Sequence, residues 1–238
     1  MTGSALTDLA AAACVSGGVL AYAVRFPGST LLAPSVCRGT NDRRAIALTF
    51  DDGPSESTPE LLEILRRHDA PATFFQCGAN VRRLPDIARE VAARGHEIGN
   101  HTDTHAPLYL KSPGFIYREI AAAGESIEQV TGRRPRYFRA PYGARWFGLR
   151  GAQARLGLLG VMWTTLALDW KLPARSVIQR VRQGAVNGAI LCLHDGRELA
   201  HRPNIGVTLE AVREVLPELI QSGFHFERLT DILCPTKN

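Results

Sequence analysis

Short apolar runs alternate with amphipathic stretches from residue 45 onward, and this rhythm constrains the fold more than any other feature. Six stretches with the apolar spacing of helices separate seven runs of strand character. The runs cover residues 45–50, 72–76, 97–100, 136–139, 159–164, 189–193 and 224–228. Strands that alternate with helices form parallel sheets whose crossovers share one hand. The rhythm therefore predicts an α/β domain, either doubly wound or curled into a barrel, with its chemistry at the carboxyl ends of the strands.

The residues at the expected helix ends agree with this rhythm. Thr58 stands where the first helix needs an N-cap, and Pro59 follows at the first helical position. Gly95, Gly132 and Gly223 follow the second, third and sixth helical stretches, as glycines that end helices do.

Residues 1–42 form a lead-in to the domain, which we place at residues 43–238, and an uncharged run over residues 9–24 dominates this lead-in. Three interpretations of the run stay open. A signal peptide would be cleaved after Ala21-Tyr22-Ala23, but Asp8 stands where a positive charge is expected. A membrane anchor would fall short of a span of about 20 residues, and a helix could instead lie against the domain. The run favours membrane association or export over a cytoplasmic location.

Composition narrows the function classes. The chain is 45% hydrophobic and 21% charged, which excludes disordered, collagen-like and coiled-coil chains. Its net charge of +5 comes from scattered arginines and fits weak attraction to an acidic polymer, but without a binding motif it predicts no nucleic-acid partner. The five cysteines include no C-x-x-C pair, which argues against cysteine-ligated zinc, and Cys37 and Cys234 could pair in an oxidising compartment. The sequence does not indicate an oligomeric state.

Acidic and histidine side chains follow the first and third strands. Asp51 and Asp52 end the first strand, and the Gly-Pro pair after them would let both carboxylates turn toward one cleft. His101 and His105 follow the third strand with a spacing that lets both rings reach one metal ion, from a helix turn or a tight loop. Asp51 or Asp52 would supply the third ligand, which leaves coordination positions open for water and substrate. Read singly, these residues also fit a solvated turn and structural histidines.

Three further strands lead into polar residues of the same kind. Arg139 ends the fourth strand, Asp169 follows the fifth and His194 follows the sixth. An arginine at a strand end presents a fixed cation that suits a carboxylate. Chance would scatter such residues over both ends of the sheet, whereas five of the seven strands carry theirs at one end. The joint placement therefore predicts a catalytic metal site.

Five motifs, in this order along the chain, resemble those of the NodB-homology polysaccharide deacetylases, carbohydrate esterase family 4. They are T-F-D-D-G-P at 49–54, H-T-D-T-H at 101–105, R-A-P-Y at 139–142, D-W at 169–170 and L-C-L-H-D at 191–195. The resemblance extends over about residues 43–232. It implies a distorted (β/α) barrel with about seven parallel strands. The implied reaction is hydrolysis of N-acetyl groups on oligo- or polysaccharides that contain N-acetylglucosamine.

The resemblance also implies roles for the residues of the first three motifs. Asp52, His101 and His105 would bind a divalent metal, with zinc favoured by the ligand types and cobalt or manganese as alternatives. Asp51 would be the general base, and Arg139 would hold that base ionised and oriented.

The remaining motifs would supply the acid and the acetyl pocket. His194 would protonate the leaving amine, because a free amide anion is too basic to leave, and Asp169 would be its partner. Trp170 and Leu193 would wall the pocket, and the backbone N–H of Tyr142 would stabilise the oxyanion. The implied substrate-binding residues are Tyr142, Pro141, Trp170 and Leu193.

One position departs from the family pattern, and alternative functions stay open. Leu166 stands where many family members carry a further aspartate, three residues before the D-W pair. Relatives on this scaffold also remove O-acetyl groups or open cyclic amides. Two histidines and one carboxylate also form the metal site of iron oxygenases, although the base Asp51 and the acid His194 argue against that chemistry. The complete set of ligands, base and acid disfavours an inactive sugar-binding module.

Overall fold

The computed structural model describes the backbone of residues 3–234 and the side chains from Cys14 onward. Residues 1–2 and 235–238, at the ends of the predicted lead-in and domain, lie outside the described residues. A single sheet of nine strands forms the centre of the described chain. Its strands are β1 (Ser35–Val36), β2 (Ala45–Gly53), β3 (Thr73–Gln76), β4 (Glu97–Asn100), β5 (Tyr137–Phe138), β6 (Leu159–Val161), β7 (Thr165–Leu166), β8 (Ala189–His194) and β9 (His225–Phe226).

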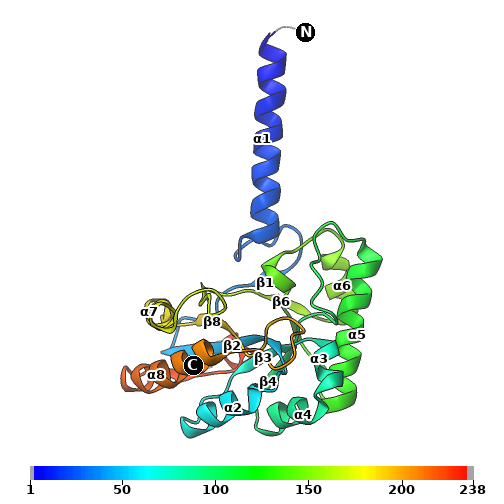
Figure 1. Ribbon diagram of the computed structural model, residues 1–238. Helices are drawn as coiled ribbons and strands as arrows, with labels where there is room; N and C mark the ends of the chain where they lie inside the picture. Colours follow the sequence, from blue (N-terminus) through cyan, green and yellow to red (C-terminus); the bar gives the residue numbers. More distant parts are fainter. Residues whose placement is uncertain (1–2, 235–238) are drawn as a thin grey trace.

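Every strand pair in the sheet is parallel. The strand order is β1-β6-β5-β4-β3-β2-β8-β7, and β9 pairs with the beginning of β2. Strands β2 to β6 are neighbours in sequence order, and no pairing among the described residues joins β7 to β1. The fold is a distorted, open (β/α) barrel, which confirms the predicted class (Figure 1). The apolar pattern did not show β1 and β7, because strands of two residues are too short to display a period.

Helices lie outside this sheet, and all but α1, which precedes the first strand, and α9, which follows the last, lie in connections between strands (Figure 1). They are α1 (Gly3–Arg25), α2 (Thr58–Arg67), α3 (Gly78–Arg83), α4 (Pro85–Ala93), α5 (Pro113–Thr131), the 3-10 turn η1 (Pro141–Gly143), α6 (Leu149–Leu156), α7 (Ala174–Gly184), α8 (Gly206–Gln221) and α9 (Leu229–Ile232). Gly132 ends α5 with a φ of 68°, the left-handed conformation predicted for a helix stop. The predicted N-cap at Thr58 is wrong: α2 already includes Thr58, and its hydroxyl donates to the Asp195 carboxylate at 2.6 Å instead.

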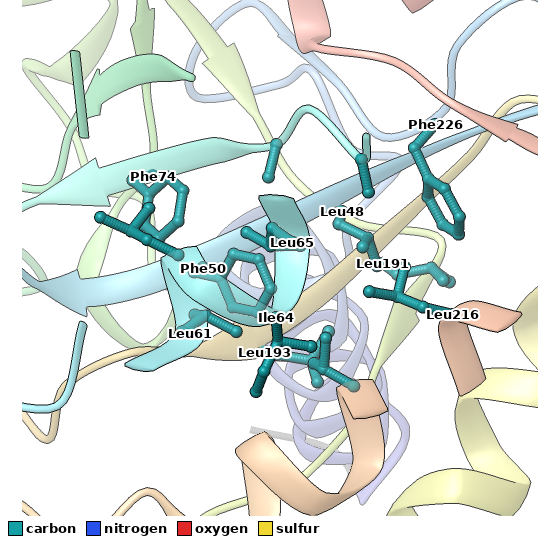
Figure 2. Packing of buried hydrophobic residues seen from close by; sticks show 14 of the residues in the cluster. Leu48, Phe50, Leu61, Ile64, Leu65, Phe74, Leu191, Leu193, Leu216 and Phe226 are labelled. Carbon is teal, nitrogen blue, oxygen red and sulfur yellow. The ribbon is translucent and has the colours of Figure 1, made fainter. Parts of the chain in front are cut away.

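The largest apolar core lies between the sheet and the helices α2 and α8 (Figure 2). Phe50 on β2 stacks on Phe74 of β3 with ring centroids 5.1 Å apart. Leu61 from α2 and Leu216 from α8 belong to the same cluster. Every residue of β2 is buried, so the strand is packed on both faces. The acids at its carboxyl end therefore stand on a rigid support.

Replacing Phe50 by alanine is expected to lower the free energy of unfolding by about 3–5 kcal/mol, because the ring is fully buried and its loss leaves a cavity. Chemical denaturation monitored by circular dichroism measures the change. Phe147→Ala is the matched control, since that ring is 56% exposed and should cost far less. Equal losses in the two variants would contradict this account of the core.

Helix α1 carries the uncharged run of the lead-in and projects away from the barrel (Figure 1). Val15 and Val19 are 67% and 54% exposed, so this part of the helix does not lie against the domain as one interpretation expected. Among the described residues, no helix is both long and apolar enough to cross a membrane. Cys37 and Cys234 are free thiols, so the disulfide considered from the sequence is not formed.

Candidate active site

The carboxyl end of β2 brings two acids to one cavity because the strand is irregular there. A regular pleat would send Asp51 and Asp52 to opposite faces. Asp52 has a φ of 72°, and the register with β3 shifts between Asp51 and Gly53, which marks a β-bulge. Both side chains consequently line one cavity of about 540 Å³. Glycine is required at position 53 because a Cβ there would meet the Asp195 carboxylate at 2.3 Å.

The loop after β4 places two histidines against Asp52. Oδ1 of Asp52 lies 3.4 Å from Nε2 of His101 and 3.1 Å from Nε2 of His105. Nδ1 of His101 lies 2.8 Å from the carbonyl oxygen of Arg139, a contact that orients the ring with Nε2 toward the acid. Thr102 and His105 adopt φ angles of 66° and 55°. The two rings therefore converge from a tight loop, which settles the choice between loop and helix that the sequence left open.

This cluster of Asp52, His101 and His105 fits a divalent metal ion. Its three ligand atoms lie within 4.8 Å of one another, and all three residues are buried. A zinc ion at about 2.1 Å from each ligand would hold them about 3.4 Å apart, close to the separations seen here. Oδ1 of Asp52 is buried and accepts no well-formed hydrogen bond, whereas the backbone N–H of Glu198 donates to Oδ2 at 2.9 Å. The carboxylate thus keeps one oxygen for a ligand.

The charge state of Asp52 also suits a metal ligand. Burial by itself would raise the pKa of this carboxyl group. The contacts with His101 and His105 outweigh burial and hold the pKa of Asp52 well below its usual range. The group is therefore ionised at neutral pH, as coordination requires.

Asp51 faces a buried arginine on the opposite side. Nη1 of Arg139 donates to Oδ1 of Asp51 at 2.7 Å and to Oγ1 of Thr49 at 2.8 Å. Backbone carbonyls of Val161 and Met162 accept from the other guanidinium nitrogens at 3.0 and 3.1 Å. Arg139 is fully buried, so its charge depends on this set of acceptors. The arrangement fixes the Asp51 carboxylate in one orientation and pairs it with a cation.

His194 forms a second acid–base pair across the cavity. Its Nδ1 lies 2.8 Å from Oδ1 of Asp169, and its backbone N–H donates to Oδ2 at 3.0 Å. Thr208 on α8 also donates to Oδ2, at 2.5 Å. Burial alone would lower the pKa of His194, but the hydrogen bond and charge of Asp169, together with the more distant Asp52 and Asp51, raise it to about 9. The ring therefore carries a proton at neutral pH.

A second group of potential ligands, Asp51, Cys192 and His194, is a weaker metal site. Burial and the nearby charge of Asp51 raise the pKa of the Cys192 thiol well above its ordinary value. A thiol, unlike a thiolate, is a poor metal ligand. Asp51 and His194 already have their own partners in Arg139 and Asp169. Of the two groups, the cluster of Asp52, His101 and His105 therefore fits an ion better.

Comparison with known proteins identifies the family. The sequence profile described as polysaccharide deacetylase matches residues 38–161, which hold Asp52, both histidines and Arg139. The chain belongs to this family. A chitooligosaccharide deacetylase of Azorhizobium caulinodans is 38% identical over 201 residues, which cover 81% of this chain and 96% of the relative. This member of the polysaccharide deacetylase family therefore matches that relative over nearly its whole length.

Two further comparisons show how widely the family fold is shared. A peptidoglycan-N-acetylglucosamine deacetylase of Bacillus cereus is 34% identical over 206 residues, 82% of this chain and 72% of the relative. The crystal structure of a family 4 pseudoenzyme from Bacillus anthracis superposes with a TM-score of 0.77 at 27% identity, over 85% of this chain and 70% of that one. Because a pseudoenzyme shares the fold, the polysaccharide deacetylase architecture alone does not establish activity.

Aromatic rings form part of the cavity wall in this family member. Trp170 packs edge-on against His194 with centroids 4.6 Å apart, and Tyr142 packs edge-on against His105 at 4.8 Å. Both rings are about half exposed and line the cavity together with Leu166.

Two of the predicted substrate-binding residues lie elsewhere. Leu193 belongs to the apolar core (Figure 2), which corrects its predicted place on the pocket wall. The alternation of β8 turns Leu191 and Leu193 to the core, whereas Cys192 faces Asp51. Pro141 is buried at the beginning of η1, next to the cavity-lining Tyr142.

Several side chains of the site carried no signal in the sequence. Thr208 holds Asp169, and Nδ2 of Asn80 donates to the carbonyl oxygen of Asp52 at 2.9 Å. The carboxylate of Glu198 accepts from the Tyr142 hydroxyl at 2.8 Å. These residues come from helices and a loop rather than from strand ends. A threonine or asparagine there resembles any surface polar residue until its burial is known.

The pKa of His194 gives a test that needs no substrate. In the metal-free protein its ring should titrate about pH 9, and Asp169→Asn should lower the pKa toward the ordinary imidazole value of about 6.5 or below. Because the folded-state pKa is raised, the pair stabilises the fold fully below pH 6.5, and this contribution is lost as pH rises through about 9. NMR of the histidine ring protons measures the midpoint. Asp86→Asn, at an exposed acid, is the control, and an unshifted midpoint in Asp169→Asn would refute the pairing.

Proposed function

We propose that this chain is a metal-dependent deacetylase that hydrolyses N-acetyl groups on oligo- or polysaccharides containing N-acetylglucosamine. One observation carries the proposal: a paired carboxylate and a paired imidazole line the same cavity as a three-ligand metal cluster. Amide hydrolysis needs a base for the attacking water and an acid for the departing amine. Relatives named as chitooligosaccharide and peptidoglycan deacetylases support the same substrate class.

Asp51 is the base in this proposal. Its carboxylate is paired with Arg139 and cannot rotate away while that hydrogen bond persists. It therefore accepts the proton of the water that attacks the acetyl carbonyl. The bulge at Asp52 is what allows adjacent residues to act as base and as ligand, since a regular strand would separate them.

His194 is the acid. The contact of Nδ1 with Asp169 leaves Nε2 as the ring nitrogen that can protonate the leaving amine. A raised pKa keeps the proton on the ring until it is needed. The alkoxide released from an ester is a better leaving group than an amide anion, so the protonated His194–Asp169 pair supports N-acetyl substrates.

Asp52, His101 and His105 would hold the metal, with zinc favoured by a ligand set of two histidines and one carboxylate. A divalent ion supplies Lewis acidity there, which polarises the acetyl carbonyl and lowers the pKa of water. The backbone N–H of Tyr142 would stabilise the developing oxyanion. Tyr142 has a φ of 56°, so this donor belongs to a backbone segment held in an uncommon conformation.

The cavity wall and the relatives support further proposals on substrate preference and on location. Leu166, in place of the family's additional aspartate, makes one part of the cavity wall apolar. The relatives that act on peptidoglycan support action on an envelope glycan, and we propose an envelope location, with residues 9–24 of the lead-in in membrane association or export. The catalytic domain proper would span residues 43–238.

Acetate release tests the proposed function. The metal-loaded protein should release acetate from N-acetylated chitooligosaccharides or peptidoglycan, and a chelator should abolish release until zinc is restored. A fully chelated protein that still hydrolyses these substrates at the original rate would refute the proposal. Release from acetylated xylan with no release from either N-acetylated glycan would favour the esterase alternative.

A further inference from the structure

The last residue of α1 lies in the wall of the catalytic cavity. Arg25 is exposed and lines the same cavity as Asp51 and His194. Its Nη1 donates to the carbonyl oxygen of Tyr142 at 3.1 Å. Next to it, the carbonyl oxygen of Val24 accepts from the backbone N–H of Arg145 at 3.1 Å. Arg25 belongs to the lead-in and precedes the segment, residues 38–161, that matches the family profile.

The guanidinium of Arg25 differs from the other guanidinium groups of the site in its partners. Arg139 pairs with Asp51 at 2.7 Å, and the cavity-lining Arg197 lies 3.7 Å from Oδ2 of Asp169. Among the described residues no carboxylate lies within 4 Å of the Arg25 guanidinium. A guanidinium has five N–H donors, and the Tyr142 carbonyl uses one of them. The other donors of this cation have no protein anion and are available to a ligand in the cavity that Arg25 lines.

The cavity has room for more than the group that reacts. Its volume of about 540 Å³ is many times the roughly 30 Å³ that one water occupies, and an acetyl group is only a few such volumes. The cavity thus has room for part of a sugar next to the acetylated one, and Arg25 is among the residues that line it. Glu198 stands on the same wall through its contact with Tyr142, so a singly charged anion suits it better than a phosphate dianion.

We propose that Arg25 binds a carboxylate on a neighbouring sugar and makes the site selective for acidic glycans. This inference rests on the proposed deacetylase function and narrows its substrate class to carboxylate-bearing glycans. Arginine's planar fork matches a carboxylate with two parallel hydrogen bonds. The net charge of +5 acts in the same direction, because it attracts an acidic polymer over longer distances.

A matched pair of substrates isolates the carboxylate. One is a tetrasaccharide of alternating N-acetylglucosamine and N-acetylmuramic acid, and the other is the same molecule with its carboxylates converted to amides. The metal-loaded wild type should prefer the acid over the amide by about 10- to 100-fold in kcat/KM, as for a charge-assisted hydrogen bond. Arg25→Gln should bring that ratio close to one, and Arg25→Lys should keep part of it.

A second exposed arginine, Arg38, provides the control. Arg38→Gln removes one exposed charge outside the cavity, where Arg38 contacts the Asn187 carbonyl, and should keep the wild-type ratio. If Arg25→Gln slows both substrates equally, Arg25 only supports the Tyr142 backbone and the inference is wrong. It is equally wrong if the wild type does not distinguish acid from amide. Calorimetry measures the ratio of the two binding constants and does not depend on catalysis. If both molecules bind but no acetate is released, the proposed function is refuted while the role of Arg25 is still tested.

Discussion

Replacing Asp51 by asparagine is expected to lower kcat for acetate release by about 10²- to 10⁴-fold, the range that one general base contributes. Asparagine keeps the shape and still accepts the hydrogen bond from Arg139, but it cannot accept the proton of the attacking water. The metal cluster does not include Asp51, so the bound metal per chain should stay unchanged. Acetate release and elemental analysis on the same preparation measure both quantities.

Asp86→Asn is the matched control for this experiment, because Asp86 is an exposed acid that pairs with Arg89 on α4. It should keep wild-type kcat. The variant Asp51→Asn leaves the buried Arg139 without a full countercharge, so its folding is checked by circular dichroism before the assay. A folded, metal-loaded Asp51→Asn protein with wild-type kcat would remove Asp51 from the role of base.

Replacing His105 by alanine should abolish both metal retention and catalysis. His101 and Asp52 alone would leave the ion with two protein ligands, fewer than the three that catalytic zinc sites use. We expect the bound metal to fall from about one per chain to a small fraction, and kcat to fall by more than about 10³-fold. Elemental analysis after gel filtration and acetate release measure these effects.

His225→Ala provides the comparison, since His225 is an exposed histidine beside Glu227 and far from the cluster in sequence and in sheet position. It should keep both metal and activity. If His105→Ala keeps a full equivalent of metal, the ion is not held by the cluster assigned here.

The sequence was sufficient to predict which residues meet, because parallel strands present their carboxyl ends at one edge of a sheet. Asp51, His101, Arg139 and His194 were predicted to converge from separate strands. In the structure Asp51 lies 2.7 Å from Arg139 and 3.9 Å from His101, and it lines one cavity with His194. It was not sufficient to choose between a doubly wound sheet and a barrel from periodicity, because both use the same alternation. The family motifs supplied that choice, and the strand order confirms it.

Other features depend on packing that a linear pattern does not contain. The bulge that turns Asp51 and Asp52 to one side includes Gly53, which packs closely on Asp195, a residue more than a hundred positions away. Thr208 supports Asp169 from a helix, where no strand-end rule applies. Leu193 was predicted to line the pocket because it precedes His194. Side chains alternate along β8, so His194 faces the cavity and Leu193 faces the core.

The resemblance to a pseudoenzyme makes the side chains, rather than the architecture, the basis of the proposed activity. A TM-score of 0.77 to that structure shows that the barrel can exist without catalysis. In this chain Asp51 has Arg139, His194 has Asp169, and the metal cluster has a buried acceptor without a hydrogen bond. The proposed base and the proposed acid therefore each have a partner that orients them, and the metal cluster keeps a free oxygen for an ion.

Anomalous diffraction from crystals of the zinc-loaded protein tests the central assignment most directly. Two groups of potential ligands lie in this site, and we propose that the ion binds to Asp52, His101 and His105. It predicts a single strong anomalous peak at the zinc edge, about 2.0–2.2 Å from Asp52, His101 and His105. A peak bound instead by Asp51, Cys192 and His194, or no peak at either group, would contradict the assignment of Asp51 as base and His194 as acid.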